Sequence, residues 1–249
     1  MFRAQQPFNK TIINNPKISV SMAGRINIIG SSHIAKESVK RVKKEIESFS
    51  PDIVALELDS NRAYALLHKD DEKPKKNYGQ MIKSVGFKGF LFAVVGSFVQ
   101  KKLGDMVGVE PGSEMRNALI VAKSKGLKVS YIDQDVEVTL RKFSKAISWK
   151  EKWQFIKDIF DVSLHPKKRK MKFDLRTVPE DKIINEMIEE VEKKYPNIHR
   201  VLVEERNVIM AKRLYALSRN YPDSKILAVV GAGHKEEILR LIKKLEKEN

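Results

Sequence analysis

Short, continuous apolar runs dominate the hydrophobic pattern of the chain. They lie at residues 26–29, 53–56, 129–132 and 226–230 and contain few polar positions. Runs of this length without strict alternation are typical of strands that are buried on both faces of a parallel sheet. We therefore predict a mostly parallel central sheet.

Helical patterns stand between these runs. Apolar residues recur at helical spacing over residues 38–49, 115–125 and 205–218, and a proline or glycine follows each segment. Helix, break and apolar strand in succession is the order of elements in the crossover units of α/β folds. Residues 18–22 are expected to add an edge strand through a hairpin. The predicted fold class is α/β, with helices flanking the sheet.

Two segments fit this order poorly, and we predict them to be helical insertions, about 69–109 and 143–195, in a single domain spanning residues 1–249. The first contains an apolar run at 85–99, which is too short to cross a bilayer. It is expected to form a buried helix or a homodimer interface. The second carries an apolar stripe that includes Trp149 and Trp153, a pattern more typical of core packing than of a cofactor site.

The chain of 249 residues carries 48 Lys and Arg against 32 Asp and Glu, a formal net charge of +16. Such an excess can attract nucleic acid or an anionic membrane. The lysines are interleaved with glutamates, however, and the densest basic run, 167–172, follows a proline and is typical of a solvated loop or helix start. We therefore do not expect a nucleic-acid partner, and a peripheral membrane contact stays open.

The chain has no cysteine, which excludes disulfides and thiolate metal sites. It has no run of about 18 apolar residues, which is the length that a transmembrane helix needs. No continuous apolar segment follows the basic residues near the N-terminus, so we expect no signal peptide. The expected location is the cytoplasm.

Polar and ionisable residues follow each of the four predicted strands. Ligands of open parallel sheets collect beyond the carboxyl ends of the strands, so this edge is the expected functional face. Two of the five histidines stand there, each three residues after a glycine at a strand end. The residues are Gly30 and His33 after the first strand, Glu57, Asp59 and Arg62 after the second, Asp133 and Asp135 after the third, and Gly231 and His234 after the fourth.

Glu57 is the residue of this set that most needs a partner, because a carboxylate inside an apolar run is costly to bury alone. It either pairs with a cation such as Arg62 or binds a metal. Each histidine alone is more typical of a structural role, but two imidazoles and a carboxylate form a common ligand set for a divalent metal. Asp59 or Glu205 is then a candidate general base. The glycine N–H groups suit a developing oxyanion or a bound carboxylate.

Six motifs stand in order between about residue 26 and residue 238. They are Gly30-Ser31-Ser32-His33, Pro51 to Asp59 with Arg62, Pro111 to Arg116, Ile132 to Asp135 with Thr139 and Arg141, Glu205-Arg206-Asn207 with Met210, and Val229 to His234. Together they resemble the TraB/PrgY/GumN family over nearly the whole chain. The resemblance implies a core like that of erythromycin-esterase-like and ChaN-like proteins.

The resemblance also implies an activity. The family includes bacterial pheromone-shutdown proteins, which limit a secreted signalling peptide, and the Tiki proteins, which are similar to metal-dependent proteases. In Tiki-like members the two G-x-x-H histidines and a glutamate are implicated in activity with manganese or cobalt. On matching positions this implies His33, Glu57 and His234 as metal ligands, with zinc as a further candidate. It also implies substrate-binding or orienting roles for Arg62, Glu114, Asp133, Asp135, Arg141 and Arg206.

Three hypotheses follow for the function. The first is a metal-dependent hydrolase of the peptidase type, acting on a peptide, such as a signalling peptide, or on a small molecule. The second is a non-catalytic protein that binds a peptide or a small anionic ligand through Arg62, Arg141 and Arg206, with the histidines as hydrogen-bonding groups. A third, nucleic-acid binding, rests on net charge alone.

Overall fold

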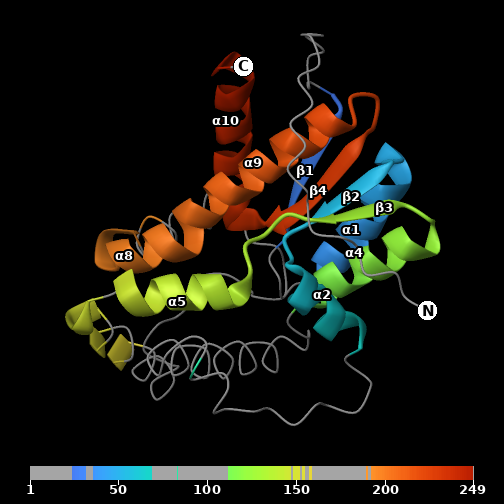
Figure 1. Ribbon diagram of the computed structural model, residues 1–249. Coiled ribbons are helices and arrows are strands. Elements are labelled where there is room, and N and C mark those ends of the chain that lie inside the picture. Colours follow the sequence, from blue (N-terminus) through green and yellow to red (C-terminus); the bar gives the residue numbers. More distant parts are fainter. Residues whose placement is uncertain are drawn as a thin grey trace.

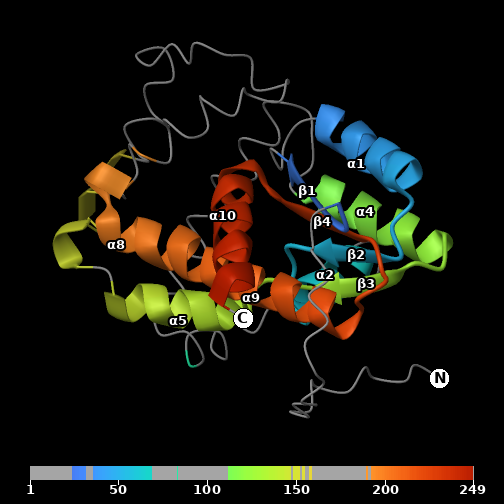
Figure 2. The same ribbon diagram turned by 90° about the horizontal axis from the view of Figure 1, so that it is seen from above.

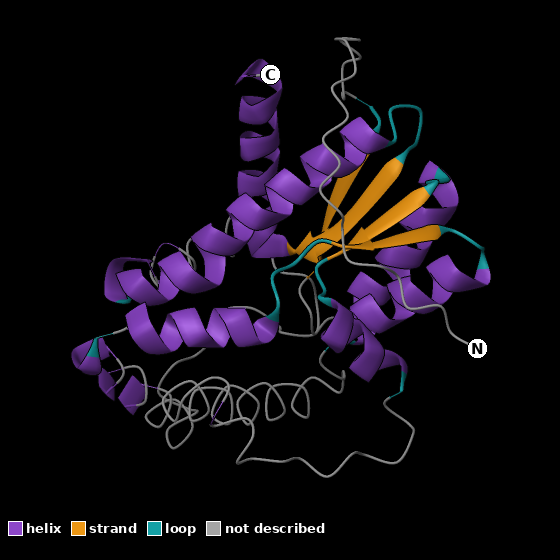
Figure 3. Ribbon diagram, in the orientation of Figure 1, coloured by secondary structure: helices purple, strands orange, loops and turns teal. Residues whose placement is uncertain are grey.

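The computed structural model describes residues 24–31, 36–68, 83, 112–146, 148–151, 153–154, 157–158, 189 and 192–248. A four-stranded parallel sheet lies at its centre. The strands follow the order β1-β4-β2-β3, and Figure 3 shows their arrowheads pointing the same way. They are β1 (Ile26–Ser31), β2 (Ile53–Leu56), β3 (Lys128–Tyr131) and β4 (Ile226–Gly231). Each strand lies within two residues of a predicted apolar run, and the α/β class is confirmed.

Helices cover both faces of the sheet (Figures 1 and 2). On one face the β2 residues Val54 and Leu56 pack in a core with α1 (Lys36–Phe49), α2 (Ser60–Leu67) and α4 (Ser113–Ser124). On the other face Ile53 and Ala55 pack with α9 (Glu205–Asn220) and α10 (Ala232–Glu248). Because successive strand residues point to opposite faces, both faces must be apolar, which explains the continuous runs.

A smaller apolar cluster lies beyond the carboxyl ends of the strands. It joins α5 (Val136–Ala146), α8 (Pro196–His199) and the π-helical turn η1 (Arg200–Glu204) through the buried side chains of Phe143, Tyr195, Ile198 and Val201. Trp149 and Trp153 are 61% and 67% exposed. The prediction that their stripe is core is therefore wrong for these two side chains, because helical periodicity does not tell which surface an apolar face meets.

Several sequence-based predictions lie outside the described residues. These are the edge strand at 18–22, nearly all of the insertion at 69–109, and most of the insertion at 143–195. In the part of the chain that the structure describes, no helix combines the length and the apolar character that crossing a bilayer requires.

Gly30 permits a close approach between β1 and α10. A Cβ atom at this position would lie 2.9 Å from the Cα atom and 3.3 Å from the Cβ atom of Ala232, the first residue of α10. The nearest atom belongs to the backbone, so it cannot rotate away. The glycine is thus needed for the contact that brings α10 against the strand ends.

We expect Gly30→Ala to lower the free energy of unfolding by about 1–3 kcal/mol, because the added methyl forces β1 and α10 apart. Urea denaturation measures the change. Ser31→Ala is the matched control in the same strand, since the buried Ser31 Oγ has no hydrogen-bond partner in the described structure. It should change stability by less than about 0.5 kcal/mol or increase it. Equal stability of Gly30→Ala and the wild type would contradict the packing argument.

Candidate functional site

Glu57 directly follows β2, and its side chain is only 4% exposed. Its backbone N–H donates to the Val229 carbonyl at 3.0 Å, which continues the pairing of β2 with β4. Its Oε2 accepts a 2.6 Å hydrogen bond from the Gly231 N–H, where β4 meets α10. Its Oε1 forms an ion pair with Arg206 on α9. Among the described residues, the cation that pairs with the Glu57 carboxylate is therefore Arg206, and not Arg62.

Arg206 binds two carboxylates at once. Its Nε and Nη2 donate to the two oxygens of Asp133 at 3.0 and 2.7 Å, while Nη2 also contacts Glu57. Nη1 donates to the Leu202 carbonyl in η1 at 3.0 Å. Burial alone would lower the pKa of Arg206, but the charge of Glu57 and the hydrogen bond and charge of Asp133 outweigh it, so this pKa lies above its usual value. Arg206 is thus a permanent buried cation.

The charged cluster consists of Glu57, Asp133 and Arg206, and Arg62 joins it from the solvent side. Asp59 caps α2 by accepting from the Arg62 backbone N–H at 2.9 Å, and its other oxygen accepts from the Arg62 Nε at 2.7 Å. The Arg62 Nη2 donates to the Glu57 carbonyl at 3.3 Å and pairs with Asp133. The side chain of Arg62 is 35% exposed and that of Arg206 only 15%. Arg62 is therefore the more accessible of the two arginines.

His234 lies in the first turn of α10 and is 8% exposed. Its Nδ1 is 2.6 Å from the Oδ1 of Asn207 on α9. Its Nε2 lies 3.5 Å from the Glu57 Oε1 and 3.4 Å from the Arg206 Nη1. The ring is therefore held on one side and directs its second nitrogen toward the charged cluster.

The pair of Glu57 and His234 fits a divalent cation in chemistry and spacing. Two ligands about 2.1 Å from a tetrahedral cation lie roughly 3.4 Å apart, and the observed separation of Oε1 and Nε2 is 3.5 Å. Arg206 faces both atoms, so a metal ion there would share the Glu57 carboxylate with the guanidinium. A carboxylate has about four acceptor positions and can serve both.

The other predicted site residues have different surroundings. Glu205 pairs with Lys142 of α5 at 2.7 Å, and its side chain is 32% exposed. Asp135 accepts from the Glu137 backbone N–H at 2.7 Å and from the Asn61 amide at 3.1 Å, so it caps the start of α5. Three further predicted residues complete the set: Glu114 is buried in α4, Arg141 is exposed on α5, and His33 lies outside the described residues.

Sequence reasoning gave no role to two residues that contact the cluster. Asn207 is 2% exposed and holds His234, and Arg213 donates to the Asp133 carbonyl. Asn207 stands on the α9 face that also buries Met210 and Leu214. A polar residue on an otherwise apolar helix face must find a buried partner. The sequence therefore already marked Asn207 as a candidate for a buried polar contact.

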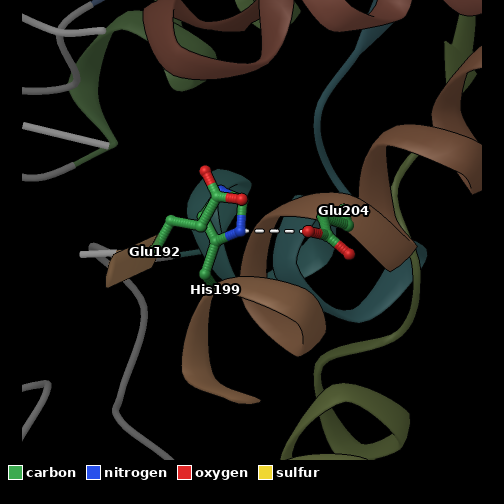
Figure 4. A group of neighbouring side chains, drawn as sticks. All are labelled: Glu192, His199 and Glu204. Carbon is green, nitrogen blue, oxygen red and sulfur yellow. Dashed lines mark hydrogen bonds and ion pairs between the residues drawn. The ribbon is translucent and has the colours of Figure 1, made fainter. Parts of the chain in front are cut away.

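A second group of ionisable side chains lies near η1. Glu192, His199 and Glu204 bring one potential ligand atom each to within 4.8 Å of one another (Figure 4). The His199 Nδ1 is 3.2 Å from the Glu204 Oε1. Both glutamates are exposed and only His199 is buried. The contact between His199 and Glu204 spans η1, and exposed carboxylates gather in this way without a metal.

The fold and the charged cluster of Glu57, Asp133 and Arg206 define an α/β protein with buried, paired charges at the carboxyl edge of a parallel sheet. The model of the TraB/PrgY/gumN family matches residues 18–249, and the chain belongs to this family. The family assignment made from the sequence motifs is therefore confirmed.

Relatives occur in archaea and mammals. An uncharacterized protein of Methanocaldococcus jannaschii is 36% identical over 231 residues, which cover 90% of this chain and 55% of that protein. TraB domain-containing proteins of Mus musculus and Homo sapiens are 26% and 25% identical, over 84% of this chain and 60% of each relative. The chain thus spans little more than half the length of these relatives.

Proposed function

We propose that the chain is a metal-dependent hydrolase that cleaves peptide bonds. The observation that supports this proposal best is the approach of the His234 Nε2 to the Glu57 Oε1, at 3.5 Å, with the ring held from its other side. A buried imidazole and carboxylate that face each other at such a distance are a common part of a catalytic metal site.

His33, Glu57 and His234 would hold the divalent cation, with manganese or cobalt as the first candidates and zinc as the third. Such a cation polarises a carbonyl and lowers the pKa of a bound water. His33 belongs to this set through its motif, because it lies outside the described residues. The buried arginine offsets part of the negative charge of the ligand set and so tunes its affinity for the cation.

The residues around these ligands supply substrate binding and proton transfer. Arg62 is half-exposed and fixed by Asp59 and Asp133, so its guanidinium suits a peptide carboxylate or carbonyl. Asp59 directs both of its oxygens at Arg62 and is less suited to accept a proton. Glu205 is the other candidate general base, with its side chain 32% exposed and paired with Lys142, which is 41% exposed.

The test is the metal content of the purified protein after equal exposure to manganese, cobalt and zinc. We expect near-stoichiometric metal in the wild type and none in His33→Ala/His234→Ala. His68→Ala is the control, because His68 is an exposed residue at the end of α2. Absence of metal from the wild type, or equal metal in the double variant, would contradict the proposal.

The alternative is a non-catalytic protein that binds an anionic peptide or small ligand. The observation that favours this alternative is the 3.4 Å contact between the Arg206 Nη1 and the His234 Nε2. The guanidinium then occupies the place beside the imidazole nitrogen that a metal ion would need. Arg62 and Arg206 would then bind the ligand, and binding would persist unchanged in a strong chelator.

A further inference from the structure

The imidazole of His234 is held between two neighbouring residues of α9. Asn207 meets its Nδ1 at 2.6 Å and Arg206 faces its Nε2 at 3.4 Å. Asn207 is 2% exposed and His234 is 8% exposed, so bulk water does not compete for the short contact. Within the described part of the chain, α9 thus contacts both nitrogens of a ring that belongs to α10.

The surroundings of the ring decide which nitrogen carries the proton when the ring is neutral. The Arg206 guanidinium can only donate hydrogen bonds, so a proton on Nε2 would set two N–H groups against each other. Glu57 would favour a proton on Nε2, but at 3.5 Å its Oε1 is beyond a normal hydrogen bond. Its two oxygens already accept from Arg206 and from the Gly231 N–H. The 2.6 Å contact therefore dominates, with the Nδ1–H donating to the Asn207 oxygen.

We infer that Asn207 is a positioning residue, which fixes His234 in the Nδ1–H tautomer and turns the Nε2 lone pair toward Arg206 and Glu57. A neutral imidazole binds a metal, or accepts a proton, only through the nitrogen that carries a lone pair. The use of that lone pair for a metal rests on the proposed function, whereas the tautomer itself does not.

The tautomer is observable by long-range ¹H–¹⁵N correlation spectra of the ¹⁵N-histidine-labelled full chain at one fixed pH, with His234→Gln to assign the signals. In the wild type, the His234 Nδ1 should show the shift of a protonated ring nitrogen and Nε2 that of an unprotonated one. Asn207→Leu removes the acceptor and should move both shifts toward the average of the two tautomers. Asn207→Asp keeps the acceptor, so the Nδ1 should keep the shift of a protonated ring nitrogen.

Two further variants guard against a structural explanation. Asn207→Ala also removes the acceptor, is smaller than the leucine variant, and replaces it if circular dichroism shows that the latter does not fold. Asn220→Leu changes an exposed asparagine at the other end of α9 and should leave the His234 signals as in the wild type. A wild-type Nε2–H tautomer, or unchanged shifts in a folded Asn207 variant that lacks the acceptor, would overturn the inference.

Manganese affinity, measured by calorimetry on the same proteins, separates the inference from the proposed function. Loss of the partner that orients a metal-binding histidine weakens metal binding by about 10–100-fold, and we expect this for Asn207→Leu but not for Asn220→Leu. If the wild type binds no manganese, cobalt or zinc while the tautomer responds as described, the proposed metal site fails and the positioning role stands. If metal binds but neither the tautomer nor the affinity responds to Asn207→Leu, the positioning role fails.

Discussion

Replacing Arg206 with leucine is expected to lower the free energy of unfolding by about 3–5 kcal/mol at neutral pH. The guanidinium is the shared partner of Glu57 and Asp133, whose side chains are 4% and 2% exposed. Leucine keeps much of the packing on α9 but removes the positive charge of Arg206 from beside the Glu57 carboxylate, in a place where solvation is poor. Removing one partner of a buried ion pair costs much more than the pair contributes, because the remaining charge stays desolvated.

The pH dependence of this loss identifies its cause. The pKa of Arg206 lies above its usual value, so in the wild type this residue stays charged throughout the range in which unfolding is measured. In the variant the buried Glu57 carboxylate lacks the charge of Arg206 and holds a proton more tightly in the folded than in the unfolded state, whereas Asp133 keeps its ion pair with Arg62. Stability then decreases as pH rises through the range in which Glu57 ionises. The deficit relative to the wild type should therefore be largest near pH 7 and smaller near pH 4.

Two additional variants test the same argument by urea denaturation. Arg206→Leu/Glu57→Gln also removes the buried negative charge that Arg206 had offset and should recover part of the lost stability. Arg219→Leu removes an exposed arginine from the last turn of the same helix and should change stability by less than about 0.5 kcal/mol. A loss for Arg206→Leu that does not vary with pH and is not relieved by Glu57→Gln would point to lost packing instead of an unpaired charge.

The sheet could be predicted from the sequence because its strands are buried on both faces. A strand such as Ile53–Leu56 then reads as an uninterrupted apolar run, bounded by a proline and a carboxylate. The order β1-β4-β2-β3 was not predictable in the same way, because the local pattern of a strand does not determine which strands pair with it. Yet this order places the end of β4 beside both β1 and β2, so that Gly231 can meet Glu57.

The gathering of these ionisable residues at one edge of the sheet was predictable, but the pairing of their charges was not. Arg62 was the obvious partner for Glu57 because it is five residues away, but Asp59 caps α2 and draws the Arg62 guanidinium toward itself. The actual partner, Arg206, is 149 residues from Glu57 in sequence, and only the packing of α9 on the sheet brings them together. Contacts of this range depend on tertiary structure, whereas helix caps and strand ends depend on local sequence.

Glu57→Gln separates the two functions that this cluster allows. In the hydrolase, glutamine is a poor metal ligand, so we expect metal affinity to fall by more than the roughly 10–100-fold that losing an outer partner of a ligand costs. Hydrolysis of a peptide library should fall with it. In the anion-binding protein, the same change removes a negative charge beside Arg206 and leaves Arg62 in place, so binding of an anionic ligand should strengthen several-fold.

The stability of Glu57→Gln must be measured beside its function, because both Glu57 oxygens face donors, the Gly231 N–H and Arg206. A glutamine sets its NH₂ group against one of these donors, at a cost of about 1–3 kcal/mol. Glu236→Gln is the control, since Glu236 is 62% exposed and only two residues beyond His234. Lost metal binding in a folded Glu57→Gln, with Glu236→Gln unchanged, supports the hydrolase. Tighter anion binding with no metal in either protein supports the alternative, in which the arginines carry the function.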